Sequence, residues 1–260
     1  MRIKRGKMIG KKSQVSLWII IAVVLLAIIA LFFILREKIN IPGITPSILE
    51  PQAYIEKCVK DASFQAIDIM LPQGGYLNPG NYKLYKNNKV AYLCYNSNYY
   101  LPCENQEPMY IETLKQEIKS YITPKLKDCF YALEQEYKKR NYQVLSGDLS
   151  LEINLNPKQV NIEINRKLTL TKNEETKKYE EFKAKVSSPI YDLGVIAQEI
   201  INQETKFCYF EYLGFSLLYP EFNIEKTDLG GETKIYSIEE KFSGKKLNFA
   251  VRSCAMPAGM

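Results

Sequence analysis

Hydrophobic residues fill one stretch near the N-terminus, residues 15–35, where Ser16 is the only polar side chain. As a helix this stretch would be about 31 Å long, close to the thickness of the hydrocarbon core of a bilayer. A helix in a globular core is rarely apolar over such a length. The pattern therefore predicts a transmembrane helix at 15–35, preceded by a tail at 1–14 and followed by a proline-containing stalk at 36–52.

The next part of the chain, 53–140, is predicted to be mainly helical. Apolar residues recur at helical spacing over 53–70 and 111–139. In the second stretch Thr123-Pro124 fits an N-cap followed by a first helical residue, which predicts two helices or one kinked helix. Between the two stretches, 82–95 has the pattern of a β-hairpin that turns at Asn87-Asn88.

The hydrophobic period changes to two after residue 140, which predicts strands in the part 141–254. Alternating apolar residues over 149–164 and 182–186 indicate an antiparallel meander with one apolar face. A helix over 189–203 is expected to cover that face. Two short strands, 234–238 and 247–252, are expected to complete an α+β fold ahead of a C-terminal tail at 255–260.

Basic residues give the chain a formal net charge of +6, and their position sets its orientation. Six of the 35 Lys and Arg residues, and none of the 29 acidic residues, lie in the first twelve positions. These six are Arg2, Lys4, Arg5, Lys7, Lys11 and Lys12. Such a tail predicts a cytoplasmic N-terminus and an extracytoplasmic domain in the cell membrane. The rest of the chain is neutral, so a nucleic-acid partner is not indicated.

Six cysteines follow the hydrophobic stretch and none precedes it, which favours disulfides over buried free thiols. Six cysteines allow 15 full pairings. Cys58 and Cys129 lie on the apolar faces of two expected helices and are the pair we expect first. Cys94 and Cys103 flank a short Tyr-rich loop, and Cys208 and Cys254 then remain for each other.

The residues just before the hydrophobic stretch, Lys11-Lys12-Ser13-Gln14-Val15-Ser16, resemble the processing site of archaeal class III signal peptides, which are found on archaellins and type IV pilins. The resemblance implies cleavage between Ser13 and Gln14 and retention of the hydrophobic helix. The fifth mature position, usually Glu in that family, is Trp18 here, which implies cleavage without extended assembly. Features over most of the chain also resemble a family of archaeal single-pass membrane proteins: the Cys58 helix, the Gly74-Gly75-Tyr76 turn, the helix leading to Cys129, the meander and the closing Phe249-Ala250-Val251-Arg252 strand. This resemblance implies surface exposure and supplies no activity.

Residues for most catalytic and metal sites are missing from the sequence. The chain has no histidine, no CxxC pair and no phosphate-binding glycine motif, so no cofactor is expected. The acidic pairs Glu180-Glu181 and Glu239-Glu240 are expected to be solvated surface, because adjacent side chains on a strand point to opposite faces. A Ser/Lys dyad is left open, because spatial adjacency is not visible in a sequence.

Tyrosine is unusually abundant, with 19 copies, several of them between residues 76 and 110. Tyr92, Tyr95, Tyr99 and Tyr100 are a candidate contact surface, since Tyr offers a large amphipathic area. The alternative is pairing of Tyr side chains across a hairpin.

The sequence as a whole predicts a non-enzymatic protein of the cell envelope, acting as a surface, adhesion or pilin-like subunit. Its expected partners are the lipid bilayer and envelope proteins or further copies of the chain. An accessory subunit of a membrane complex is the second hypothesis, and an extracytoplasmic enzyme using carboxylates or a Ser/Lys pair is the third.

Overall fold

The computed structural model of the chain describes residues 22–26, 50–98, 100–230 and 232–254. The chain divides into two compact units, residues 1–48 and 49–260. In the first unit only 22–26 are described, and they are helical. The predicted tail, Ser13, Gln14 and most of the predicted transmembrane helix and stalk lie outside the described residues. None of the helices within the described ranges has the length and apolar character needed to cross a membrane.

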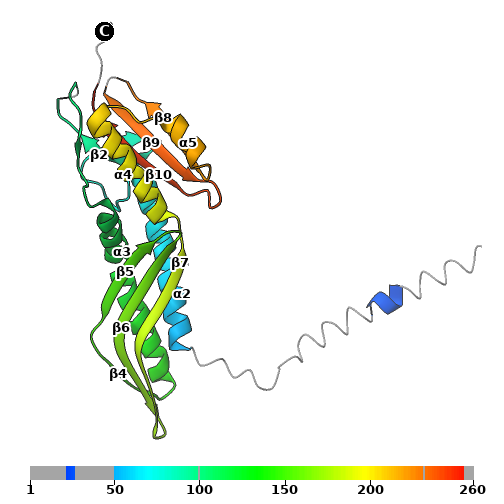
Figure 1. The fold of residues 1–260 in the computed structure, drawn as a ribbon. Helices are drawn as coiled ribbons and strands as arrows, with labels where there is room; N and C mark the ends of the chain where they lie inside the picture. The colour runs from blue at the N-terminus through cyan, green and yellow to red at the C-terminus, as the bar shows by residue number, and fades with distance from the viewer. Residues whose placement is uncertain (1–21, 27–49, 99, 231, 255–260) are drawn as a thin grey trace, which may run out of the picture. The chain divides into compact units, whose positions relative to one another are not determined.

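The second unit is built of helices and two β-sheets, which confirms the predicted α+β class (Figure 1). Its helices are α2 (Pro51–Met70), the 3-10 helix η1 (Leu71–Gln73), α3 (Tyr110–Lys139), α4 (Ile190–Phe207) and α5 (Tyr212–Leu218). Its strands are β1 (Tyr82–Tyr85), β2 (Asn88–Tyr95), β3 (Glu104–Asn105), β4 (Gln143–Ser146), β5 (Ser150–Asn156), β6 (Gln159–Lys172), β7 (Glu175–Ser187), β8 (Phe222–Asp228), β9 (Thr233–Glu240) and β10 (Lys246–Arg252).

Strands β4 to β7 form the predicted antiparallel meander. β6 pairs with β4 and β5 on one side and with β7 on the other. Its apolar face is covered by α2, which packs along β7, and by α3, which packs along β5 and β4. The expectation that the helix now seen as α4 covers this face is wrong, because α4 lies mainly against the other sheet and reaches the meander only at β5.

The second sheet pairs strands from the N-terminal and C-terminal parts of the unit. Its strand order is β1-β2-β10-β9-β8, with β3 paired to β2. β2 and β10 run parallel, and Tyr92 lies opposite Ala250. The sheet is therefore mixed, and it combines strands from both of the parts, 53–140 and 141–254, into which the sequence pattern divides the chain.

Helix α3 runs without interruption through Pro124, where the sequence predicts an N-cap. The Thr123 hydroxyl donates to the Lys119 carbonyl at 2.6 Å, so it bonds back along the helix and caps nothing. Buried residues continue at helical spacing on both sides of the proline, from Ile122 to Leu126. Their packing outweighs the hydrogen bond that an exposed interior proline removes.

The β1–β2 hairpin turns one residue earlier than predicted. Tyr85 pairs with Asn88, and the two residues between them, Lys86 and Asn87, have φ values of 47° and 67°. A two-residue turn that matches the twist of its strands needs φ > 0 at both central positions. Asn88 is the first residue of β2 and belongs to the ladder rather than to the turn.

Three disulfides link the six cysteines in the pairs expected from the sequence. They are Cys58–Cys129, Cys94–Cys103 and Cys208–Cys254, with Cα–Cα distances of 6.6, 5.4 and 5.7 Å. The first joins α2 to α3, the two helices that cover the apolar face of the meander. The second closes the loop between β2 and β3, and the third joins the end of α4 to the residue that follows β10 by two positions.

Candidate contact surface

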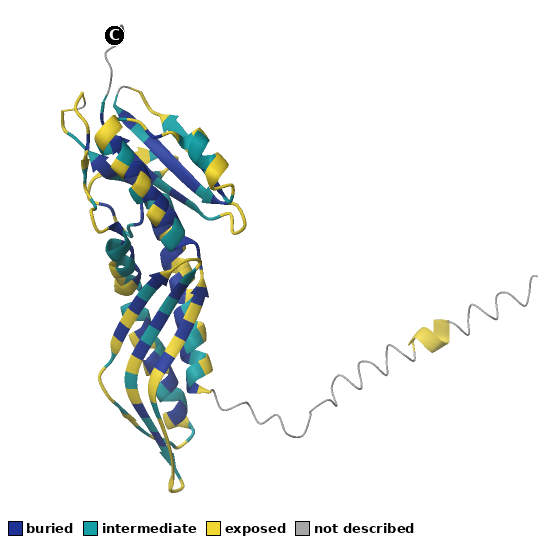
Figure 2. Cartoon of the chain, viewed as in Figure 1, coloured by how far each residue is buried: buried dark blue, intermediate teal, exposed yellow. Residues whose placement is uncertain are grey.

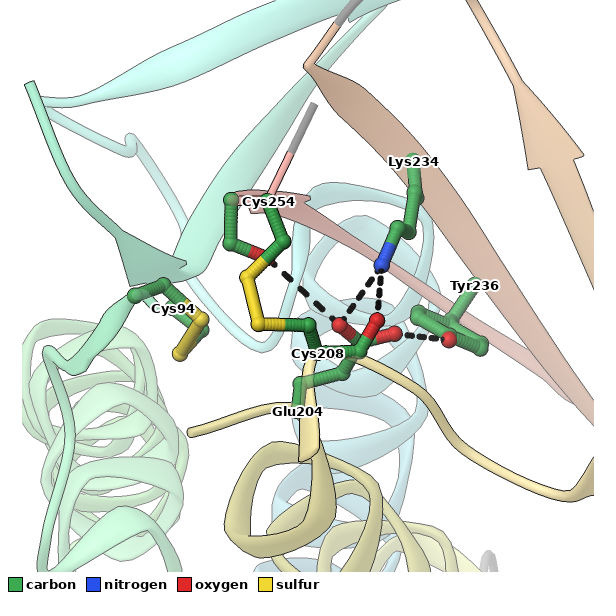
Figure 3. Close-up of polar contacts among 8 residues, drawn as sticks. Cys94, Glu204, Cys208, Lys234, Tyr236 and Cys254 are labelled. Atoms are coloured by element: carbon green, nitrogen blue, oxygen red, sulfur yellow. Dashed lines mark hydrogen bonds and ion pairs between the residues drawn. A yellow bond between two sulfur atoms is a disulfide. The ribbon is translucent and has the colours of Figure 1, made fainter. Parts of the chain in front are cut away.

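The C-terminal end of α4 is fixed by a buried polar cluster around Glu204 (Figure 3). Glu204 lies on the apolar face of α4 and is fully buried. Its carboxylate accepts from the Lys234 ammonium at 2.7 Å and from the Tyr236 hydroxyl, both on β9. The Lys234 ammonium also donates to the carbonyl of Cys208 at 2.8 Å. One cation thus joins the buried carboxylate to the chain leaving the helix.

Two further observations show that this cluster is structural. Burial, followed by the charge of Glu204, raises the pKa of Tyr236 far above its ordinary value, so the phenol stays protonated as a donor. The Ser253 hydroxyl lies 3.5 Å from the Glu204 carboxylate, but only 1% of Ser253 is exposed. A serine and a lysine do share this site, as one hypothesis allowed, yet a substrate could not reach the serine.

The disulfide Cys208–Cys254 connects this cluster to two distant segments (Figure 3). Cys208 ends α4 in the left-handed conformation, with φ 56°, and its N–H bonds the Glu204 carbonyl. Cys254 donates its N–H to the carbonyl of Leu101, in the loop between β2 and β3, at 3.1 Å. The end of α4, the end of β10 and the β2–β3 loop therefore meet at one end of the unit.

Large apolar side chains are exposed at the end of α4 and on α5, the helix that follows it. Phe207 is 69% exposed, Leu217 84% and Leu218 77%. We name the exposed apolar side chains of the β2–β3 loop, of the end of α4 and of α5, which packs against β8, the apical surface: Tyr100, Leu101, Phe207, Leu213, Leu217 and Leu218. Figure 2 shows the exposure of α5 and of the end of α4 in the view of Figure 1. Surface of this kind is uncommon where nothing is bound.

Helix α5 contacts the core through Tyr212 and Phe215, which are half-buried, and none of its residues is fully buried. The fully buried Phe210 lies with its ring 5.4 Å from that of Phe215 on α5 and 6.2 Å from that of Tyr236. At the start of α5 the Glu211 carboxylate accepts from the Gly214 N–H at 3.3 Å. The apical surface is thus presented on a fixed support.

The tyrosines expected to form a contact surface are only partly available. Tyr92 and Tyr95 are half-buried, with rings 5.2 Å apart, and Arg252 donates to the Tyr95 hydroxyl at 2.8 Å. Tyr99 lies outside the described residues. Tyr100 is 61% exposed and belongs to the apical surface. The alternative of cross-strand tyrosine pairs fails in the β1–β2 hairpin, where Tyr82 lies opposite Ala91 and Tyr85 opposite Asn88.

The two acidic pairs have different surroundings. Glu180 and Glu181 are exposed, as expected. Glu240 is buried, which contradicts the expectation of a solvated pair. Its carboxylate can be buried because it accepts hydrogen bonds from the N–H groups of Phe242 and Ser243 in the β9–β10 turn, at 3.1 and 2.8 Å. Burial opposes ionisation, but the hydrogen bonds from Ser243 and Phe242 outweigh it and hold the pKa of Glu240 below its ordinary value.

The site as a whole could not be found from the sequence. Glu204 falls within a helical pattern as an ordinary polar residue, and only the helix face that it shares with Ile200 and Ile201 hints at its burial. Among the residues that the structure describes, no group of acidic, histidine or cysteine side chains could hold a metal ion. Comparisons with known protein families, with curated proteins and with solved structures find no match to this chain.

Proposed function

We propose that this chain is a membrane-anchored, extracytoplasmic protein of the cell envelope that binds another envelope protein through its apical surface. The observation that carries the proposal is the apical surface itself, in which exposed leucines and Phe207 stand on a support fixed by Glu204 and Cys208–Cys254. Large apolar anchors that are ordered before binding lose little entropy when a partner covers them.

The anchor in this proposal rests on the hydrophobic stretch at 15–35 and the basic tail before it. The three disulfides support an oxidising compartment for the second unit. Within that unit, α2 begins beside β7 and leads into η1, which lies beside β2 and β10. The apical surface therefore lies in the lobe away from residue 50, where the chain enters the unit.

A protein partner fits this surface better than a lipid surface does. The charged residues near α5 and the end of α4 have both signs: Lys206, Glu211 and Glu221 are neighbours in sequence, and the Lys226 ammonium lies over the ring of Tyr212 on α5. A lipid-binding face is usually rimmed by basic residues that meet anionic head groups. A mixed polar rim around an apolar centre is the usual anatomy of a protein interface.

Site-specific photo-crosslinking in native membranes tests the proposal. A photoreactive residue at Leu217 is expected to give a covalent product with a second polypeptide. The same residue at Leu145, which is 73% exposed on β4, is the matched control and is expected to give none. A Leu217 product that contains only lipid, or none beyond that from Leu145, would contradict the proposal.

A further part of the proposal is maturation by cleavage between Ser13 and Gln14, carried by the Lys11–Ser16 motif. The new amine would meet the positive end of the helix dipole, and Trp18 cannot relieve that conflict as a glutamate would. We therefore expect cleavage without polymerisation. Mass spectrometry of the native N-terminus decides the matter, since a chain that starts at Met1 or Arg2 would leave a simple signal anchor.

A further inference from the structure

A hollow of about 560 Å³ lies where the end of β5, the start of α3 and the middle of α4 come together. These three elements contact one another in pairs (Figure 1). Asn161, on β6, lies opposite Asn154 of β5 in the ladder, and both residues line the hollow. The volume is in the range of small-molecule binding sites, so the hollow is large enough to hold a small ligand.

Side-chain amides make up most of the uncharged polar lining of the hollow. They are those of Asn154, Asn156, Asn161 and Gln198. Each carboxamide has one acceptor oxygen and an NH₂ group with two donors. Within the described part of the chain only two of the four form side-chain hydrogen bonds: Asn154 donates to the Glu152 carboxylate at 3.3 Å, and Gln198 to the Pro108 carbonyl at 3.5 Å. Most of the hydrogen-bonding capacity of this lining is therefore left for a ligand.

The side-chain oxygen of Asn161 is the member of this set that most requires a partner. It is buried, and no described residue donates a hydrogen bond to it. A buried acceptor without a donor is unfavourable and uncommon in folded proteins. The χ2 torsion of asparagine is soft, so the carboxamide can turn this oxygen toward a hydroxyl group held in the hollow.

The charged side chains of the lining are already balanced. Lys115 forms an ion pair of 2.8 Å with Glu112, and both residues line the hollow. Glu163 also lines it and has Lys183 of β7 opposite it in the ladder. No unpaired cation is therefore left among the described lining residues to bind an anion, and the lining favours a neutral ligand.

The start of α3 adds apolar surface to this polar lining. Met109 is 70% exposed and lines the hollow together with Ile111. A saccharide combines hydroxyl groups, each of which both donates and accepts, with C–H groups on the faces of its rings. The carboxamides match the hydroxyl groups, and Met109 and Ile111 match the C–H groups.

We propose that this hollow binds a neutral saccharide. The amides of Asn154, Asn161 and Gln198 bond its hydroxyl groups, and Met109 packs against a ring face. The ligand is either a free saccharide or a glycan chain attached to another envelope component, since both offer the same hydroxyl groups. The hollow and the apical surface share no residues, so this site does not depend on the proposed function.

Binding of the full chain to an array of neutral and acidic oligosaccharides tests the inference, in a detergent that has no sugar head group. Neutral glycans are expected to bind. The double variant Asn154→Ala/Asn161→Ala and the single variant Gln198→Ala should each weaken that binding at least about tenfold, because each removes hydrogen bonds to hydroxyl groups. Isothermal titration with the free form of each bound glycan identifies the source, since an attached glycan chain is required if only the array form binds.

Matched controls separate the site from general effects on the fold. Asn165→Ala lies on β6 and Gln203→Ala on α4, both outside the hollow, and neither should change the affinity. Leu217→Glu in the apical surface should also leave it unchanged. Circular dichroism checks that each variant is folded, and Gln198→Ala decides the matter if the double variant is not. Binding of acidic glycans alone, binding of none, or equal losses in the hollow variants and their controls would overturn the inference.

Discussion

The carboxylate of Glu204 on α4 and the ammonium of Lys234 on β9 form an ion pair of 2.7 Å in which the Glu204 side chain is fully buried and that of Lys234 is 16% exposed. The pair fixes the end of α4 against the C-terminal strands. Removing the cation would leave a buried carboxylate without a counter-charge, which costs more than the pair itself contributes.

We therefore expect Lys234→Met to lower the free energy of unfolding by about 3 kcal/mol, measured by chemical denaturation. The double variant Glu204→Gln/Lys234→Met should recover part of this loss, because it removes the buried charge together with its partner. Lys183→Met breaks an exposed ion pair with Glu181 and is the control, with no measurable change expected. Equal stability of the Lys234 variant and the control would contradict the structural role.

The longest disulfide loop should contribute most to stability. Cys58 and Cys129 are 71 residues apart, and closing that loop is worth about 4 kcal/mol in the chain-entropy account. Replacing both by alanine should lower the free energy of unfolding by roughly this amount and leave the meander folded. Non-reducing peptide mapping is the direct check of the framework, and recovery of six free thiols from carefully alkylated protein would refute it.

Stability should fall at alkaline pH because several tyrosines are buried as neutral phenols. Burial raises the pKa of Tyr137 to about 12 and that of Tyr236 further still. The unfolded chain loses these protons near pH 10 while the folded chain keeps them, so the folded state binds more protons. The free energy of unfolding is therefore expected to be unaffected by these tyrosines up to about pH 9 and to decrease above pH 10.

Replacing Tyr236 by phenylalanine removes one of these groups. Above pH 10 the free energy of unfolding of the Tyr236→Phe variant should fall less steeply with pH than that of the parent, by up to about 1.4 kcal/mol per pH unit. Denaturation series at several alkaline pH values measure both slopes, and identical slopes would show that Tyr236 is not protected from ionisation.

The turn after η1 requires glycine at Gly75. Its φ is +86°, and an added Cβ would lie 2.5 Å from both the Leu114 Cδ2 and the Tyr110 hydroxyl. We expect Gly75→Ala to lower the free energy of unfolding by about 2 kcal/mol or more, through left-handed backbone strain and overpacking. Gly80→Ala is the control, since no atom lies within 4 Å of its added Cβ. Similar thermal unfolding of the two variants would contradict this account.

The spacing of hydrophobic residues predicted the helices and strands well where one face of the element is buried. The alternation of Leu151, Ile153 and Leu155 identified β5 because each of these side chains packs on the helices. The Cys58–Cys129 pair followed from the same logic, since both residues lie on helix faces that meet. The predicted alternative of two helices divided at Pro124 was wrong, because the proline lies on the exposed side of α3, where packing elsewhere along the helix compensates for it.

Features that depend on distant segments could not be predicted. The apical surface exists because Cys208, Cys254 and Leu101 meet, and no local pattern relates these three positions. Helix α5 was missed for a related reason: its apolar residues are mostly outside the core, so its sequence does not show the one-sided period of a packed helix. Glu240 was misjudged because its partners are backbone groups of a turn that forms only once β9 and β10 pair.

The parallel pairing of β2 with β10 has a consequence for how the molecule is made. β2 ends at Tyr95, and its neighbour in the sheet is the last strand of the chain, ending at Arg252. Synthesis proceeds from the N-terminus, so β2 emerges long before its parallel partner, which begins at Lys246. Contacts between such distant segments raise the contact order and slow folding. The meander and its two helices can form earlier, whereas β2 stays without its parallel partner until β10 has emerged.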